Sequence, residues 1–134
     1  MATKQIFVNL PVKDLPKSKV FFEALGYSFN PQFTDENAAC LVISDTIYAM
    51  LLTEEFFKRF TSKEIVDAKK STEVLVCLST ESRAEVDDLV RKAVAAGGRV
   101  YNDPQDHGFM YGHGFEDLDG HQWELAFMEP SHVQ

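Results

Sequence analysis

The sequence predicts an α+β fold built from two copies of one strand–helix–strand–strand–strand (βαβββ) module. The same order of strand-like and helix-like segments occurs twice along the 134 residues. The first strands of the two copies, near Phe7 and Glu73, lie about 66 residues apart. Hydrophobic side chains make up 45% of the chain, which is enough for a packed core. Two such modules are expected to form a curved, mostly antiparallel sheet around a concave pocket.

The first module is expected over residues 4–60. Its predicted elements are a strand at 6–12, a helix after Asp14, strands at 27–33, 38–44 and 46–52, and a short helix at 54–60. Asp14 followed by Pro16 is typical of a helix start, because a carboxylate caps free N–H groups and proline lacks one. Val20, Phe21 and Leu25 are expected to form the apolar side of this helix.

The second module is expected over residues 73–129, after a polar linker at 61–72. Its predicted elements are a strand at 73–78, a helix after Ser82, and strand-like pieces at 99–101, 109–116 and 122–128. Ser82 and Glu85 match a capping box, and the next apolar residues follow helical spacing: Val86, Leu89, Val90 and Ala93. Residues 117–120 (DLDG) predict the turn of the last hairpin.

Composition argues against two classes of partner. The net charge of −8 would repel a nucleic-acid backbone. No apolar run approaches the roughly 20 residues that a membrane helix needs. Cys40 and Cys77 each lie in an apolar run, so both are expected to be buried free thiols. Free thiols, with no signal-peptide pattern at the start, predict a cytoplasmic protein.

Two segments resemble the vicinal oxygen chelate superfamily of glyoxalases, bleomycin resistance proteins and extradiol dioxygenases. They are residues 7–15 (FVNLPVKDL), followed by Ser18 and Phe21-Phe22, and residues 117–125 (DLDGHQWEL). The resemblance covers about residues 4–129. It implies one glyoxalase-like domain over residues 1–134 with paired βαβββ modules, a metal centre in catalytic members, and frequent homodimers.

The metal ligands that the resemblance implies are only partly present. Phe7 stands where the family has His, and the end of the first module, near Leu51, offers no hard ligand. Glu73 stands where the second module usually has His, and Glu124 matches the family's last ligand. Divalent transition metals such as zinc, nickel, iron and manganese usually need three or four protein donors, and two of the four positions here are apolar. No metal or other cofactor is therefore expected. A divalent metal held by Glu73, Glu124 and His113 stays a weaker alternative.

Glu124 and His113 are the candidate catalytic residues. Glu124 alternates with Trp123, so it faces the pocket if Trp123 faces the helices. There it would act as a general base or bind a cationic group. His113 would pair with Glu124 across two strands as an acid–base partner. Each residue also has an alternative without a catalytic role. Glu124 would be a carboxylate held by structural hydrogen bonds, and His113 would be a histidine at the edge of a strand.

Six further residues are the candidate pocket-binding residues. Asn9 would be a polar anchor on the same strand face as Phe7, and Glu73 would add a second carboxylate unless it is a solvated strand end. The aromatic and methionine side chains would otherwise be ordinary core. The set is Phe7, Asn9, Tyr48, Met50, Glu73 and Tyr111.

These residues predict a glyoxalase-like protein that binds a small molecule or acts as a metal-independent lyase or isomerase. The substrate is not predicted, and the choice between enzyme and binding protein stays open. One alternative is a bleomycin-resistance-type protein that sequesters an apolar or cationic ligand. Another is a divalent-metal lyase similar to lactoylglutathione lyase. The partners expected are a small molecule and a second copy of the chain.

Overall fold

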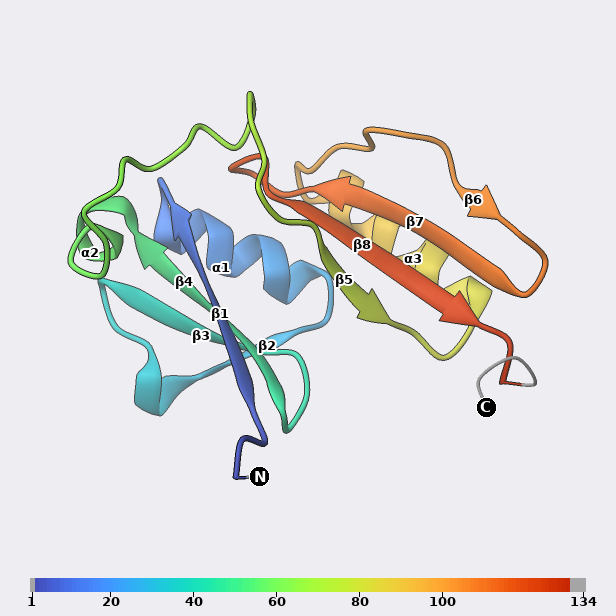
Figure 1. The fold of residues 1–134 in the computed structure, drawn as a ribbon, viewed down its shortest axis with the longest axis horizontal. Helices are drawn as coiled ribbons and strands as arrows, with labels where there is room; N and C mark the ends of the chain where they lie inside the picture. The colour runs from blue at the N-terminus through green and yellow to red at the C-terminus, as the bar shows by residue number, and fades with distance from the viewer. Residues whose placement is uncertain (1, 131–134) are drawn as a thin grey trace. The chain divides into compact units, whose positions relative to one another are not determined.

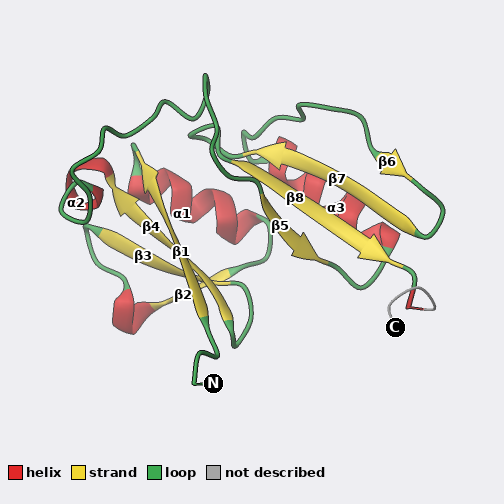
Figure 2. Cartoon of the chain, in the orientation of Figure 1, coloured by secondary structure: helices red, strands yellow, loops and turns green. Residues whose placement is uncertain are grey.

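The computed structural model describes residues 2–130, and the chain divides into two compact units, Met1–Val66 and Asp67–Gln134. We call them the first and second modules. Each module contains one open four-stranded mixed sheet with a long helix against one of its faces (Figures 1 and 2). No helix within the described residues is long and apolar enough to span a bilayer.

The first module contains four strands, two helices and one short 3-10 turn. In chain order they are β1 (Ile6–Val12), α1 (Leu15–Ala24), β2 (Ser28–Asn30), the 3-10 turn Pro31–Phe33, β3 (Ala38–Val42), β4 (Ile47–Thr53) and α2 (Glu54–Phe57). The strand order is β1-β4-β3-β2, with β1 parallel to β4 and the other pairs antiparallel. Helix α1 packs against β2, β3 and β4.

Helix α1 begins and ends where the sequence predicts. The Asp14 carboxylate accepts a hydrogen bond from the backbone N–H of Lys17 at 3.1 Å. Gly26 follows the helix with φ +104°, a backbone angle that side chains disfavour. The prediction that Val20 lies on the apolar side is wrong, because Val20 is 66% exposed. The other two residues of the prediction, Phe21 and Leu25, are 1% and 3% exposed and lie in the core as predicted.

The second module repeats the first. Its elements are β5 (Val76–Ser79), α3 (Arg83–Ala95), β6 (Gln105–Asp106), β7 (Met110–Glu116) and β8 (Gln122–Met128). The strand order β5-β8-β7-β6 has one parallel pair, β5 with β8, at the same position as in the first module. Helix α3 packs against β7 and β8 (Figure 1). The predicted fold class, two repeated βαβββ modules with mostly antiparallel pairing, is confirmed.

Two predicted strands of the second module differ from the structure. The first strand begins at Val76, so Glu73 lies outside it and is exposed. Of the piece predicted at 99–101, only Arg99 makes a bridge, to Glu116. The fourth strand is formed by β6, which pairs with β7. This strand contains only two residues, both polar, so it is too short to be recognised by alternation of polar and apolar residues.

The turn between β7 and β8 is held by one buried carboxylate. Asp117 is 6% exposed. Its Oδ1 accepts the backbone N–H groups of Asp119 and His121, and its Oδ2 accepts the indole N–H of Trp123, each at 3.0 Å. Gly120 takes φ +93°. The turn predicted at 117–120 is therefore confirmed, and it fixes the indole of Trp123 in the core.

Candidate functional site

The register of the second sheet divides its side chains between two faces. Glu124 of β8 lies beside Cys77 of β5 and opposite Gly114 of β7. Paired residues of a ladder project to the same side, so these three share one face. Trp123 and Leu125 project to the other face, towards α3, and each is 1% exposed. The expectation that Glu124 faces away from the helix side is confirmed.

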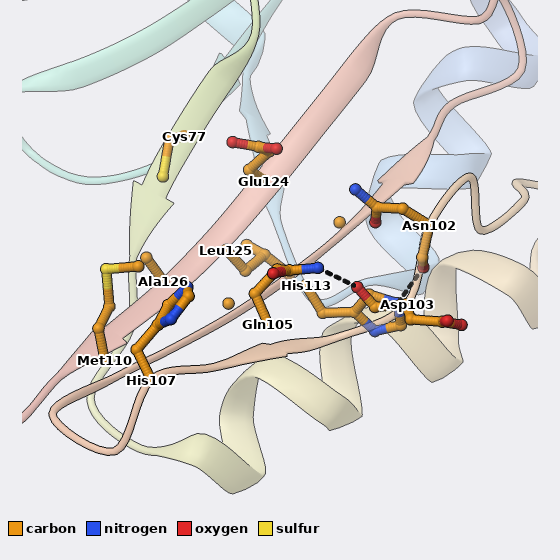
Figure 3. A pocket seen from close by; sticks show the side chains of 12 residues that line it. Cys77, Asn102, Asp103, Gln105, His107, Met110, His113, Glu124, Leu125 and Ala126 are labelled. Atoms are coloured by element: carbon orange, nitrogen blue, oxygen red, sulfur yellow. Dashed lines mark hydrogen bonds between the residues drawn. The ribbon is translucent and has the colours of Figure 1, made fainter.

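A cleft of about 210 Å³ lies in the second module at the face that carries Glu124 (Figure 3). Strands β5, β7 and β8 and the segment before β7 supply its lining. The lining residues are Cys77, Asn102, Asp103, Gln105, His107, Met110, Gly112, His113, Gly114, Glu124, Leu125 and Ala126. The lining combines the half-buried carboxylate of Glu124 with small and apolar groups, and residues 102–107 and His113 add an exposed carboxylate, two amides and two imidazoles; such a mixed lining suits a small organic molecule.

Tyr101 is the protein's hydrogen-bond donor to Glu124. Its hydroxyl lies 3.3 Å from Oε2 of the carboxylate. Burial, and then the nearby Glu124 charge, raise the pKa of Tyr101 to about 12. The hydroxyl therefore keeps its proton at neutral pH and donates it towards the carboxylate.

Gly114 makes room for this contact. A Cβ at this position would lie 2.6 Å from the Tyr101 hydroxyl and 2.5 Å from the backbone oxygen of Trp123. Any side chain here would therefore displace Tyr101 or separate β7 from β8. A residue without a side chain allows such a close approach within a strand, and the groups that approach Gly114 are the Tyr101 hydroxyl and the backbone oxygen of Trp123.

Cys77 lies next to Glu124 on the same face of the sheet (Figure 3). The prediction that both cysteines are buried holds for Cys40, which is 1% exposed, but Cys77 is exposed. Alternation explains the difference, because the buried residue of this strand is its neighbour Leu78. Partial desolvation, and then the charge of Glu124, raise the pKa of the Cys77 thiol. The thiol is therefore a neutral neighbour of the carboxylate.

The predicted pairing of His113 with Glu124 is wrong. His113 lies opposite Leu125 in the β7–β8 ladder, so its side chain leaves the sheet on the face opposite to that of Glu124. Its Nε2 lies 2.9 Å from the backbone oxygen of Asn102, and because that oxygen only accepts, Nε2 carries the proton. His113 therefore holds the segment beside the cleft (Figure 3).

Two of the predicted pocket residues in the second module do not line the cleft. The Tyr111 hydroxyl donates to Asp87 of α3, and the guanidinium of Arg83 lies 5.3 Å from the ring centroid. Tyr111 therefore belongs to the interface between sheet and helix. Glu73 is exposed and precedes β5.

The four predicted pocket residues of the first module do lie together. Phe7 pairs with Tyr48 and Asn9 with Met50 across the parallel β1–β4 ladder, so all four share one face. The rings of Phe7 and Tyr48 stack with centroids 4.7 Å apart. This arrangement confirms their predicted proximity, while a part in ligand binding stays a prediction.

The donor set does not fit the metal centre that the resemblance implies. Leu51 is 0% exposed and faces the core. Asn9 and Cys77 occupy equivalent positions in the two modules, because each lies five residues before the residue that caps the following helix. Met50 pairs with Asn9 and Glu124 pairs with Cys77, so Met50 is the counterpart of Glu124 in the first module. Phe7 has no lone pair to offer, and a methionine thioether is a soft ligand. Across residues 2–130, no three His, Cys, Asp or Glu side chains are grouped to hold a metal ion.

Sequence reasoning did not identify Tyr101 and Cys77 as site residues. The signal for Cys77 was present, because it lies two residues before the end of a strand and alternates with the apolar Val76 and Leu78. Tyr101 carries no such signal. It lies in an irregular segment, where no period assigns side chains to a face.

Comparison with known proteins agrees with this architecture. The bleomycin resistance protein-like N-terminal family matches residues 4–44. A solved structure of a hypothetical protein from S. aureus is 32% identical, over 92% of this chain and 93% of that protein, with a TM-score of 0.78. A glyoxalase-related enzyme from Fulvimarina pelagi is 21% identical, over 92% and 88%, with a TM-score of 0.75.

A third similar structure is the fosfomycin resistance protein FosX from Mesorhizobium loti, which is 14% identical over 98% and 97% of the two chains, with a TM-score of 0.70. No curated protein sequence matches the chain. The opening and closing motifs, the two βαβββ modules and these similarities lead to one conclusion. The chain has the fold of the vicinal oxygen chelate superfamily, and its residues 4–44 match the bleomycin resistance protein-like N-terminal family.

Proposed function

We propose that this protein binds a small molecule whose positively charged group contacts Glu124 in the cleft of the second module. The observation that carries the proposal is a half-buried carboxylate without a cationic partner. Among residues 2–130, no lysine or arginine forms a salt bridge with Glu124. A carboxylate withdrawn from water gains from a charged donor, and such a hydrogen bond contributes about 1.5–3 kcal/mol.

The remaining lining supports a small ligand body. Met110 and Ala126 supply apolar contact, and Gly112 leaves the surface beneath the cleft free of a side chain. Typical ligand pockets measure roughly 300–1,000 Å³. A cleft of about 210 Å³ therefore accepts a single ring with its charged substituent, or one end of a longer molecule.

A second candidate is metal-independent proton transfer by Glu124. It is favoured by the Tyr101 hydroxyl, which lies 3.3 Å from the carboxylate and would act as the acid beside a base. His113 is excluded as the partner by the register of the ladder. Binding is the simpler of the two functions, because it needs only a carboxylate without a cationic partner and the apolar part of the lining. The match of residues 4–44 to the bleomycin resistance protein-like N-terminal family also supports the binding candidate.

The test is a thermal-shift screen of small aromatic amines against neutral compounds of the same shape. We expect amines to raise the melting temperature of the wild-type protein, and Glu124→Gln to abolish the shift while keeping the shape of the side chain. Glu116→Gln is the matched control, because Glu116 stands on the adjacent strand β7 but does not line this cleft. Equal shifts for amines and neutral compounds, or for Glu124→Gln and wild type, would contradict the proposal.

Formation of a homodimer and a cytoplasmic location stay predictions from the sequence. Neither is needed for the proposed binding, because all residues that line the cleft belong to the second module. Size-exclusion chromatography of the full chain with light scattering measures the oligomeric state directly.

A further inference from the structure

The two oxygens of the Glu124 carboxylate have different surroundings. Oε2 lies 3.3 Å from the Tyr101 hydroxyl, which donates to it. Within residues 2–130, no other donor forms a hydrogen bond with this carboxylate, so Oε1 receives none from the protein. A ligand that enters the cleft therefore meets one oxygen already engaged and one oxygen without a donor.

Tyr101 is held in place from both sides along the chain. Two residues earlier, the backbone groups of Arg99 and Glu116 exchange two hydrogen bonds of 3.1 and 2.7 Å. One residue later, the backbone oxygen of Asn102 accepts from His113 Nε2. The ring reaches across Gly114, the residue opposite Glu124 in the ladder. The hydroxyl is thus a fixed part of the site rather than a mobile surface group.

Cationic groups differ in what they require from a carboxylate. Amidinium and guanidinium groups donate two parallel hydrogen bonds and bind most strongly when both oxygens are accessible. An ammonium group is a compact point charge with three rotatable donors, so it can direct one donor at a single oxygen without needing a second oxygen in a fixed position. The Tyr101 hydroxyl already occupies one of the two acceptor positions of Oε2, so the second arm of a fork would have to share this oxygen with it.

We propose that Tyr101 is a specificity-determining residue that makes the cleft select ammonium ligands over amidinium and guanidinium ligands. This inference rests on the proposed function, because it presupposes that Glu124 binds the ligand's positive charge. The burial that raises the pKa of Tyr101 to about 12 keeps its proton in place at neutral pH, so the selection holds over the neutral range.

The test compares two probes with similar aromatic bodies, benzylamine and benzamidine, by isothermal titration calorimetry on the full chain. The wild-type protein is expected to bind benzylamine more tightly, by on the order of tenfold, since benzamidine loses one charged hydrogen bond. Tyr101→Phe keeps the ring and removes the hydroxyl. It is expected to strengthen benzamidine binding and to remove or reverse the preference.

Each outcome decides one question. A wild-type preference for benzamidine, or a preference that Tyr101→Phe leaves unchanged, would overturn the role of Tyr101 while leaving Glu124 as the binding residue. Failure of both probes to bind, or binding that Glu124→Gln does not weaken, would overturn the proposed function itself. Far-ultraviolet circular dichroism and the melting temperature of Tyr101→Phe establish that the variant is folded.

Discussion

Alanine at Gly114 and alanine at Gly112 place the same methyl group on the same strand with opposite expected results. At Gly114 the new Cβ would lie 2.5 Å from the backbone oxygen of Trp123, an overlap that the β7–β8 ladder cannot relieve without shifting. Overpacking of this kind costs about 1–3 kcal/mol of unfolding free energy. At Gly112 the nearest atom, the backbone oxygen of Leu125, would be 3.5 Å away, which is ordinary contact. There alanine should be neutral or stabilising by about 0.4–1 kcal/mol, because it restricts the unfolded chain.

Urea unfolding of the two variants beside wild type measures these free energies, and benzylamine titration measures the effect on binding. Gly112→Ala should stay as stable as wild type and yet bind benzylamine more weakly, because its methyl occupies the cleft. Gly114→Ala should be less stable and should lose the preference for ammonium, because Tyr101 is displaced. Equal stabilities, or unchanged benzylamine binding in Gly112→Ala, would refute the geometry of the cleft.

Two further predictions follow from single contacts. Asp117→Asn should lower the unfolding free energy by about 2 kcal/mol in urea melts, because an amide N–H₂ faces the indole N–H of Trp123; an unchanged midpoint would contradict this. Tyr101 should ionise near pH 12 in an ultraviolet titration compared with Tyr101→Phe. Because its pKa is raised above the ordinary 10.0, unfolding becomes easier as pH rises from 10 towards 12. Glu124→Gln should lower that pKa while burial keeps it above 10.0, and an unmoved pKa would show that the two groups do not interact.

Rules that use only a few neighbouring residues were sufficient to predict where the two long helices begin. Asp14 and Ser82 accept hydrogen bonds from backbone N–H groups three residues later, as their spacing predicts. Each helix end depends on a few neighbouring residues, so the sequence contains the information needed. The same holds for Asp117, whose bonds to the turn close within six residues.

The face of a strand depends on the pairing register, and the pattern of one strand does not supply it. Alternation along a strand puts Tyr111, His113 and Phe115 on one face, but the side of Glu124 relative to them depends on the length of the turn. The turn places Gly114, rather than His113, opposite Glu124. A shift of one residue would have exchanged the two faces. The predicted acid–base pair was wrong for this reason.

The contact between Tyr101 and Glu124 could not be predicted from the sequence, because Tyr101 lies in an irregular segment. Tyr101 reaches Glu124 because Arg99 bridges to Glu116 and because Gly114 has no side chain. A glycine within a strand is compatible with a close approach by another group, but it does not identify that group. Which residue approaches depends on how the segment between α3 and β7 folds back, and no periodic pattern records that path.

Calorimetric titration of benzylamine into wild type and Glu124→Gln tests the central claim most directly. The account predicts saturable binding to wild type with one ligand per chain, and at least about tenfold weaker binding to the variant, since one charged hydrogen bond is lost. Equal affinities for the two proteins would contradict it. In that case the carboxylate of Glu124 is a structural partner of Tyr101 and not a ligand-binding group.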